Sequence, residues 1–240
     1  MLSTVYSGAV YGVEAYPVEI EVNAGRGDPQ TVVVGLPDAA VKESKDRVWT
    51  AIWNSGFQTH FGRTTINLAP ADKKKEGPSF DLPIAIGILA ASGEFGVERL
   101  SQYALVGELA LSGEVRRVRG VLPIAMCAQQ AGLRGIIVPA DNAEEAAVVE
   151  GLEVYPVRTL REAADFLAGE LALSPFKIDL VALYTQDTNH QLDFSEVKGQ
   201  ETAKRAIEVA VAGGHNIIMI GPPGIVFKYN AGITCCGTIR

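Results

Sequence analysis

The segment that ends in Gly221-Pro222-Pro223-Gly224 has the residue types of a phosphate-binding loop. Residues 216–220 form an apolar run typical of a buried strand, and a glycine-rich turn after such a strand can direct backbone N–H groups at phosphates. A complete loop also needs a lysine for the β- and γ-phosphates and a hydroxyl for magnesium. Positions 226–228 instead hold Val, Phe and Lys, and Tyr follows them. Gly221, Pro222, Pro223 and Gly224 are therefore the predicted nucleotide-binding residues of an incomplete loop.

The residues after this turn change in character at Ile225. They show no helical periodicity, although a helix must follow such a loop to direct its N-terminal dipole at the phosphates. We interpret residues 225–240 as a non-native or out-of-frame tail; a degenerate natural loop is the alternative. We expect this chain to bind neither ATP nor magnesium.

Ser79 ends a polar loop at residues 73–79 and precedes an apolar run at residues 80–91. A serine hydroxyl becomes a good nucleophile only beside a base. Arg117 and Arg119 cannot serve, because a guanidinium stays protonated at any working pH. The loop's own lysines would have to fold back. We therefore predict that Ser79 caps a helix over residues 80–91, with Asp81 in its first turn, and that the chain has no catalytic residue.

Two further groups of residues could bind ligands. A loop and a hairpin that share one face could gather a basic patch for DNA phosphates, although a solvated surface is the favoured interpretation. This patch would contain Lys73, Lys74, Lys75, Arg116, Arg117 and Arg119. His60, His190 and His215 have no metal-ligand spacing, and no metal site is predicted.

Strands and helices follow one another in the pattern of an α/β (α+β) domain, with helices packed on a mixed sheet over residues 1–173. Asp38 occupies the position of an N-cap before a helix that continues through residue 54. Residues 174–192 have the composition of a linker, and a further helix is expected from residue 201 with Ala203, Ile207, Ala210 and Val211 on one face. The expected strands are 3–13, 16–23, 31–34, 64–68, 104–110, 115–118, 135–139 and 152–157, and the other expected helices are 80–91, 122–130, 143–150 and 160–168.

The overall composition is that of a globular protein with a core. The chain has 240 residues, 48% of them hydrophobic and 20% charged, with a formal net charge of −7. This charge excludes attraction to nucleic acid or anionic membranes by bulk electrostatics, so any DNA contact must be local. Three cysteines without zinc or disulfide spacing predict a reducing, cytoplasmic environment. No run of eighteen apolar residues occurs, and no membrane role is expected.

Three stretches resemble the magnesium-chelatase-like AAA+ ATPases of the ComM/YifB type. They are VGLPDAAVKESKDRV at 34–48, INLAPADKKKEGPSFDLPIAIGIL at 66–89, and the segment from Asp193 through AKRAIEVAVAGGHNIIMIGPPG. The resemblance covers residues 1–224. It implies that residues 193–224 open an AAA+ module and that residues 1–173 form a domain similar to the proteolytic domain of Lon.

The likeness to Lon rests on KEGPSFDLPIA at 75–85 and GELALSGEVRRVRGVLPIA at 107–125. In Lon-type peptidases, the serine of the first stretch is the nucleophile, and a lysine on the helix after the hairpin of the second stretch is its base. The resemblance places these positions at Ser79 and Leu122. An alkyl side chain cannot accept a proton, so the implied domain is catalytically silent.

For a longer protein that contains this chain, the resemblance implies an ATP- and magnesium-dependent hexameric motor, with DNA branch migration as the associated role. This chain would then hold only a regulatory or assembly domain and a few nucleotide-site residues. Two alternatives remain. A Lon-like serine peptidase would need a base, and a magnesium chelatase subunit would lack an N-terminal domain of this size.

Overall fold

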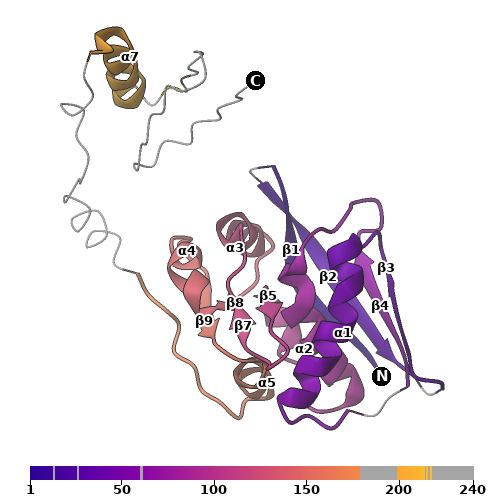
Figure 1. The fold of residues 1–240 in the computed structure, drawn as a ribbon. Coiled ribbons are helices and arrows are strands. Elements are labelled where there is room, and N and C mark those ends of the chain that lie inside the picture. The colour runs from indigo at the N-terminus through magenta and orange to yellow at the C-terminus, as the bar shows by residue number, and fades with distance from the viewer. Residues whose placement is uncertain are drawn as a thin grey trace. The chain divides into compact units, whose positions relative to one another are not determined.

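The computed structural model describes residues 1–12, 14–25, 27–59, 62–178, 199–213, 215 and 217. The chain divides into two compact units, Met1–Ile178 and Asp179–Arg240. The first unit is an α/β domain built on a seven-stranded sheet (Figure 1). Its fold class is the one that the sequence predicts. The predicted strand at 216–220, apart from residue 217, the phosphate-binding turn and the tail lie outside the described residues, as do His60, His190 and most of the 174–192 segment.

Six of the seven sheet strands run in one direction. The order is β3-β4-β2-β1-β5-β8-β9, and only β2 is antiparallel to its neighbours. The strands are β1 (Leu2–Tyr11), β2 (Glu14–Ala24), β3 (Gln30–Val34), β4 (Arg63–Ala69), β5 (Tyr103–Leu105), β8 (Gly135–Pro139) and β9 (Glu153–Val157). Because the carboxyl ends of parallel strands meet at one edge, the loops after six strands leave the sheet at that edge.

Helices pack on both faces of the sheet and create two cores. The larger core joins one face to α1 (Ala39–Asn54), α2 (Asp81–Ser92) and α5 (Leu160–Ala168). The smaller core joins the other face, around β5, β8 and β9, to α3 (Val121–Gln130) and α4 (Ala143–Ala147). Both cores consist mainly of aliphatic side chains with almost no exposure, and the larger one also contains aromatic rings. Burial of apolar surface is therefore the main force that holds the layers together.

Helix α2 is apolar on all sides because it lies between the sheet and neighbouring helices. All of its residues except the last are buried. Gly87 allows it to approach β1 and β2 closely, since a Cβ there would lie 2.7 Å from Val22 Cγ2. The hydroxyl of Ser3 on β1 donates to the carbonyl of Gly87 at 2.8 Å. The prediction of a buried helix over this apolar run is confirmed.

Several predicted boundaries are wrong for identifiable reasons. The predicted strand 104–110 is divided into β5 and β6 (Glu108–Leu109), because Gly107 leaves the sheet to exchange backbone hydrogen bonds with Ser79 and Leu82 at the start of α2. The partner of β6, β7, covers only Val115–Arg116. Helix α4 ends at Ala147 instead of residue 150. The first strand ends at Tyr11 instead of residue 13, and β2 already begins at Glu14.

The second unit contains α7 (Glu201–Ala212) among its described residues. Ile207 and Ala210 are buried, as the predicted apolar face requires, but Val211 is 55% exposed. The chain turns back on the side of Ala210, where the N–H of His215 donates to the carbonyl of Ala210 at 2.8 Å. Val211 lies on the solvent-exposed side of α7. Among the described residues, no helix has the length and apolarity needed to cross a membrane.

A group of aromatic side chains anchors α5 to the amino edge of the sheet. Tyr103, Tyr155 and Phe166 contact one another with ring centroids 4.6–5.6 Å apart. The Tyr155 hydroxyl donates to Glu153 at 2.9 Å, and Arg134 contacts the same carboxylate at 2.8 Å. Burial, followed by the hydrogen bond to Glu153, raises the pKa of Tyr155 to about 12.

This tyrosine gives a testable pH dependence. Its pKa is higher in the folded than in the unfolded chain, so its contribution to stability is complete below pH 10 and is lost as the pH rises toward about 12. The phenolate absorbance of the wild type and of Tyr155→Phe should be titrated against pH. The difference between the two curves should show one phenol that ionises near pH 12. In Glu153→Gln, which removes the acceptor charge, that transition should move toward pH 10. An unchanged midpoint in Glu153→Gln would contradict this explanation.

Candidate functional site

The loops at the carboxyl edge of the sheet contain the residues that the sequence singles out in the first unit. This edge is where open α/β sheets usually place their sites. The loop after β4 holds Ser79, the loop after β5 holds the arginines, and α3 begins at Val121 close to Leu122. Helices α2 and α3 pack on opposite faces of the sheet, so Ser79 and Leu122 enter this edge from different layers.

Ser79 lies in a single turn of 3₁₀ helix, η1 (Pro78–Phe80), and is half-buried. Its carbonyl accepts the Gly107 N–H at 3.0 Å, which fixes the backbone. Its hydroxyl makes no hydrogen bond to any residue that the structure describes. The predicted N-cap is therefore wrong: α2 begins after Phe80 with no side-chain cap, because the 3₁₀ turn already occupies the capping position. The prediction that no base serves Ser79 remains a prediction.

A buried carboxylate, Asp81, holds the start of α2 against α1 and β6. The side chain has no solvent exposure. One oxygen accepts the Ser44 hydroxyl at 2.5 Å and Arg47 Nη2 at 3.1 Å. The other accepts Arg47 Nε at 2.6 Å and the Leu109 N–H at 3.1 Å. The hydrogen bond to Asp81 raises the pKa of the Arg47 guanidinium. Four donors therefore satisfy this one carboxylate, in a charge-assisted network next to Ser79 in the sequence.

A second carboxylate, Asp38, ties the loop before Ser79 to the start of α1. One oxygen caps α1 by accepting the Val41 N–H at 2.8 Å, and the other accepts the Gly77 N–H at 3.2 Å. The two loops also pair directly, since the Lys75 carbonyl accepts the Asp38 N–H and the Lys75 N–H donates to the Leu36 carbonyl. The predicted N-cap at Asp38 is confirmed.

Lys75 cannot belong to a surface patch, because its side chain is completely buried. Its ammonium donates to the carbonyls of Pro70 and Lys73 within its own loop. Burial lowers the pKa of Lys75 below its ordinary value. Lys74 pairs with Glu76 at 2.8 Å, and Lys73 lies 4.4 Å from the centroid of the Tyr16 ring. The alternative of one patch made of all six cations is therefore wrong, and the favoured interpretation of a solvated surface holds for the other five cations but not for Lys75.

Leu122, which the resemblance to Lon places at the position of the base, lies beside a carboxylate from α4. One oxygen of Glu145 accepts the Leu122 N–H at 3.1 Å, and the other accepts the Asn142 amide at 2.9 Å. Asn142 is completely buried, and its amide also bonds both backbone groups of Val118. Helix α3 has no side-chain cap of its own, so Glu145 satisfies one of its free N–H groups from outside.

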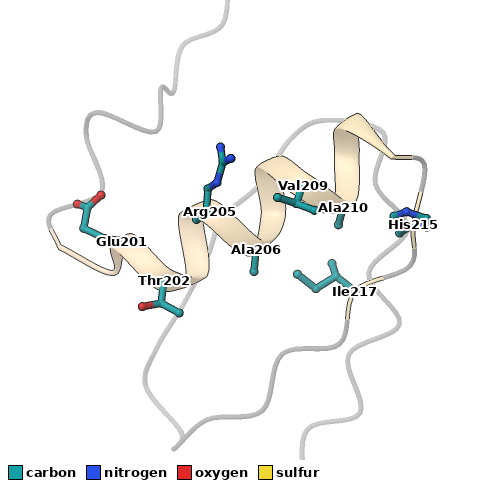
Figure 2. Close-up of a pocket in the computed structure, with 8 residues that line it drawn as sticks. All are labelled: Glu201, Thr202, Arg205, Ala206, Val209, Ala210, His215 and Ile217. Atoms are coloured by element: carbon teal, nitrogen blue, oxygen red, sulfur yellow. The ribbon is translucent and has the colours of Figure 1, made fainter.

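The described part of the second unit has a groove of about 790 Å³ along α7. Figure 2 shows Thr202, Ala206 and Ala210 along the helix and Ile217 beside them. Its polar side chains are Glu201, Thr202, Arg205 and His215. The predicted nucleotide-binding residues, Gly221 to Gly224, lie outside the described residues, so their arrangement stays a prediction.

Sequence reasoning did not identify the roles of Arg47, Asn142 and Glu145. One signal was available: Ser44 and Arg47 lie three residues apart on α1, and Ser44 interrupts the apolar face. A polar residue at a buried position requires a partner, which here is Asp81. For Asn142 the spacing of three residues to Glu145 was visible, but its bonds to Val118 were not, because Val118 contributes only backbone atoms.

Comparison with known proteins covers both units. Residues 20–142 match the family described as subunit ChlI of Mg-chelatase, and residues 193–227 match that described as magnesium chelatase, subunit ChlI. Competence protein ComM of Haemophilus influenzae is 44% identical over 225 residues, which cover 93% of this chain and 44% of ComM. YifB of Escherichia coli, an uncharacterized protein, is 45% identical over 224 residues, which cover 93% of this chain and 43% of YifB.

A more distant similarity supports the expected relation to Lon. Lon protease 2 of Bacillus subtilis is 25% identical over 175 residues, covering 65% of this chain and 31% of that protease. The chain thus spans less than half of the length of ComM and YifB. The matches to the ChlI families and to these two relatives confirm the predicted family, and the chain belongs to the magnesium-chelatase-like family of the ComM/YifB type.

Proposed function

We propose that this chain is the amino-terminal part of an ATP-driven motor that acts on DNA, and that its α/β domain is a non-peptidolytic assembly module. The observation that carries the proposal is the identity of 44% to a competence protein across nearly the whole chain. Uptake and recombination of DNA during competence require an energy source. The nucleotide site of such a motor would be completed by residues beyond Gly224.

The geometry of the first unit supports a structural role over peptidase chemistry. Ser79 has the nucleophile position, but Leu122 has the base position and its N–H is occupied by Glu145. Lys75 is the lysine closest to Ser79 in the sequence, and its ammonium donates hydrogen bonds to two carbonyls of its own loop. Asp38 and Asp81 fix the loop on both sides, as a rigid module requires. A hexamer with bound ATP and magnesium is the assembly that we propose for the longer protein.

A chimera tests the motor function. Residues 1–224 of this chain would be joined to the corresponding remainder of Haemophilus influenzae ComM. The expected result is DNA-stimulated phosphate release and ATP-dependent movement of a branched DNA junction. The control replaces the lysine of the completed phosphate loop with alanine and should lose both activities. A chimera that assembles and hydrolyses ATP without any response to DNA would overturn the proposal, and casein cleavage would favour the peptidase alternative.

A further inference from the structure

Strand β3 forms one end of the seven-stranded sheet, next to β4 (Figure 1). Among the described residues, no backbone group outside β4 forms a hydrogen bond with residues 30–34. The strand at the opposite end, β9, is covered instead, because its Val154 carbonyl accepts the N–H of Phe176 at 2.7 Å. The chain therefore closes one end of its sheet, whereas within the described ranges the outer backbone groups of β3 are unpaired.

The sequence of β3 lacks the features that usually protect an edge strand from pairing with another chain. Natural edge strands carry charged residues, a proline or a bulge. The sequence of β3 is QTVVV, without charge or proline, and its register with β4 is continuous from Gln30 to Val34. The backbone is also held beyond the strand, because Lys75 donates its N–H to the carbonyl of Leu36 at 3.2 Å. Strand β3 is therefore an ordered, neutral strand whose outer edge can accept another strand.

The side chains of β3 suit a strand partner on both faces of the sheet. Thr31 and Val33 face α1, since the Thr31 hydroxyl accepts the Trp49 indole N–H at 2.8 Å and Val33 packs against the larger core. Val32 and Val34 alternate with them and lie on the other face, where Val34 is 42% exposed. These valines and the threonine are β-branched, and such side chains form favourable cross-strand pairs.

A hollow of about 500 Å³ lies between β3 and α1 beside this edge. Its lining includes Thr31 of the strand and Lys45, Asp46 and Trp53 of the helix. Lys45 and Asp46 are adjacent and both exposed, and Trp53 is 44% exposed. The helix beside the open strand therefore presents one positive charge, one negative charge and a partly exposed ring.

We propose that β3 is a dimer interface, at which it pairs in the antiparallel direction with β3 of a second copy of this chain. A two-fold axis at the centre of the strand places Val32 opposite Val32 of the copy and Thr31 opposite Val33. This register brings no like charges together, because β3 carries none. The two α1 helices flank the joined strands in opposite directions, so Lys45 of one copy lies toward Asp46 of the other. The surface is thus complementary to itself, as a two-fold contact requires.

A second copy fits this edge better than a flexible peptide does. A disordered segment would lose conformational entropy at each residue that it orders along β3, whereas β3 of a second copy is ordered before it binds. The absence of charge on β3 also leaves it no means to select a peptide by charge. The contact is small, so the dimer should be weak. A ring of six chains uses head-to-tail contacts, so this two-fold contact is independent of the proposed motor and its hexamer.

Sedimentation velocity of the 240-residue chain, from micromolar to near-millimolar concentration, tests this dimer. The wild type should pass from monomer to dimer within this range. Val32→Lys places two like charges opposite each other at the axis and should weaken association on the order of tenfold or more. Val32→Glu should do the same. An equimolar mixture of these two variants should form a dimer again, because the charges that then meet have opposite signs.

The matched control is Thr65→Lys, which adds the same charge on β4 at the position that pairs with Val32. In the dimer its two copies would lie three strand spacings apart, about 14 Å, where salt screens their repulsion, so it should dimerise as the wild type does. A wild type that stays monomeric, an equal loss in both lysine variants, or a mixture that forms no dimer overturns the inference. If circular dichroism shows that Val32→Lys does not fold, hydrogen exchange of the wild type decides. The amides of residues 30–34 should exchange more slowly at high than at low protein concentration, and unchanged exchange overturns the inference.

Discussion

Asp81→Ala is expected to lower the free energy of unfolding of the α/β domain by about 3–5 kcal/mol. The substitution removes a carboxylate with no solvent exposure and leaves three kinds of donor without an acceptor: the Arg47 guanidinium, the Ser44 hydroxyl and the Leu109 N–H. Removing one partner of a buried ion pair costs far more than the pair contributes, because the remaining charge is uncompensated. For a domain of ordinary stability, this is a large part of the total.

Urea unfolding followed by circular dichroism measures this effect. The control is Glu76→Ala, which breaks the exposed ion pair with Lys74 and should cost about 0–1 kcal/mol. Asp81→Ala/Arg47→Ala should lose less than the sum of the two single variants, because the partners are coupled. A loss below about 1 kcal/mol in Asp81→Ala would show that water or other groups replace the carboxylate easily.

The unmodified chain is expected to show neither ATP binding at phosphate-loop affinity nor ATP hydrolysis. Its sequence has the glycine-rich turn through Gly224, but Phe227 stands where the loop needs a lysine. The four substitutions Ile225→Ser, Val226→Gly, Phe227→Lys and Lys228→Thr supply the missing lysine and hydroxyl. They should raise affinity for ATP and magnesium without producing turnover, because an acidic magnesium ligand is still required.

Isothermal titration with ATP and magnesium, together with a phosphate-release assay, separates binding from hydrolysis. The matched control carries three of the four substitutions and keeps Phe227, so that only the charge for the β- and γ-phosphates is lacking. It should bind no better than the unmodified chain. Affinity in the micromolar range or turnover above background in the unmodified chain would show that residues 225–228 form a working loop of another kind.

The elements whose patterns are local and repeated could be predicted from the sequence. Asp38 precedes apolar residues that recur at helical spacing, and this pattern predicted both the N-cap and helix α1. The long apolar run at residues 80–91 predicted α2. Strands 135–139 and 152–157 were recognisable because they are short apolar runs between turn residues. These features depend on neighbours in the chain, which a sequence displays directly.

The features that depend on distant residues could not be predicted. Gly107 ends β5 because it bonds Ser79 and Leu82, which lie more than twenty residues earlier. Lys75 is held in the interior by backbone hydrogen bonds to Leu36 and Asp38, which lie more than thirty residues earlier, whereas a run of three lysines suggests a solvated surface. The capping of α3 by Glu145 likewise joins two helices. Such pairings follow from tertiary contacts, and no periodicity encodes them.

The central claim is that the domain keeps the position of a Lon nucleophile without a base to activate it. The most direct measurement is the intact mass of the chain after exposure to a serine-reactive fluorophosphonate at neutral pH. Without a base near its hydroxyl, Ser79 should react no faster than an ordinary surface serine. The account predicts no adduct that depends on Ser79. A stoichiometric adduct in the wild type that disappears in Ser79→Ala would contradict it and would make the domain a peptidase.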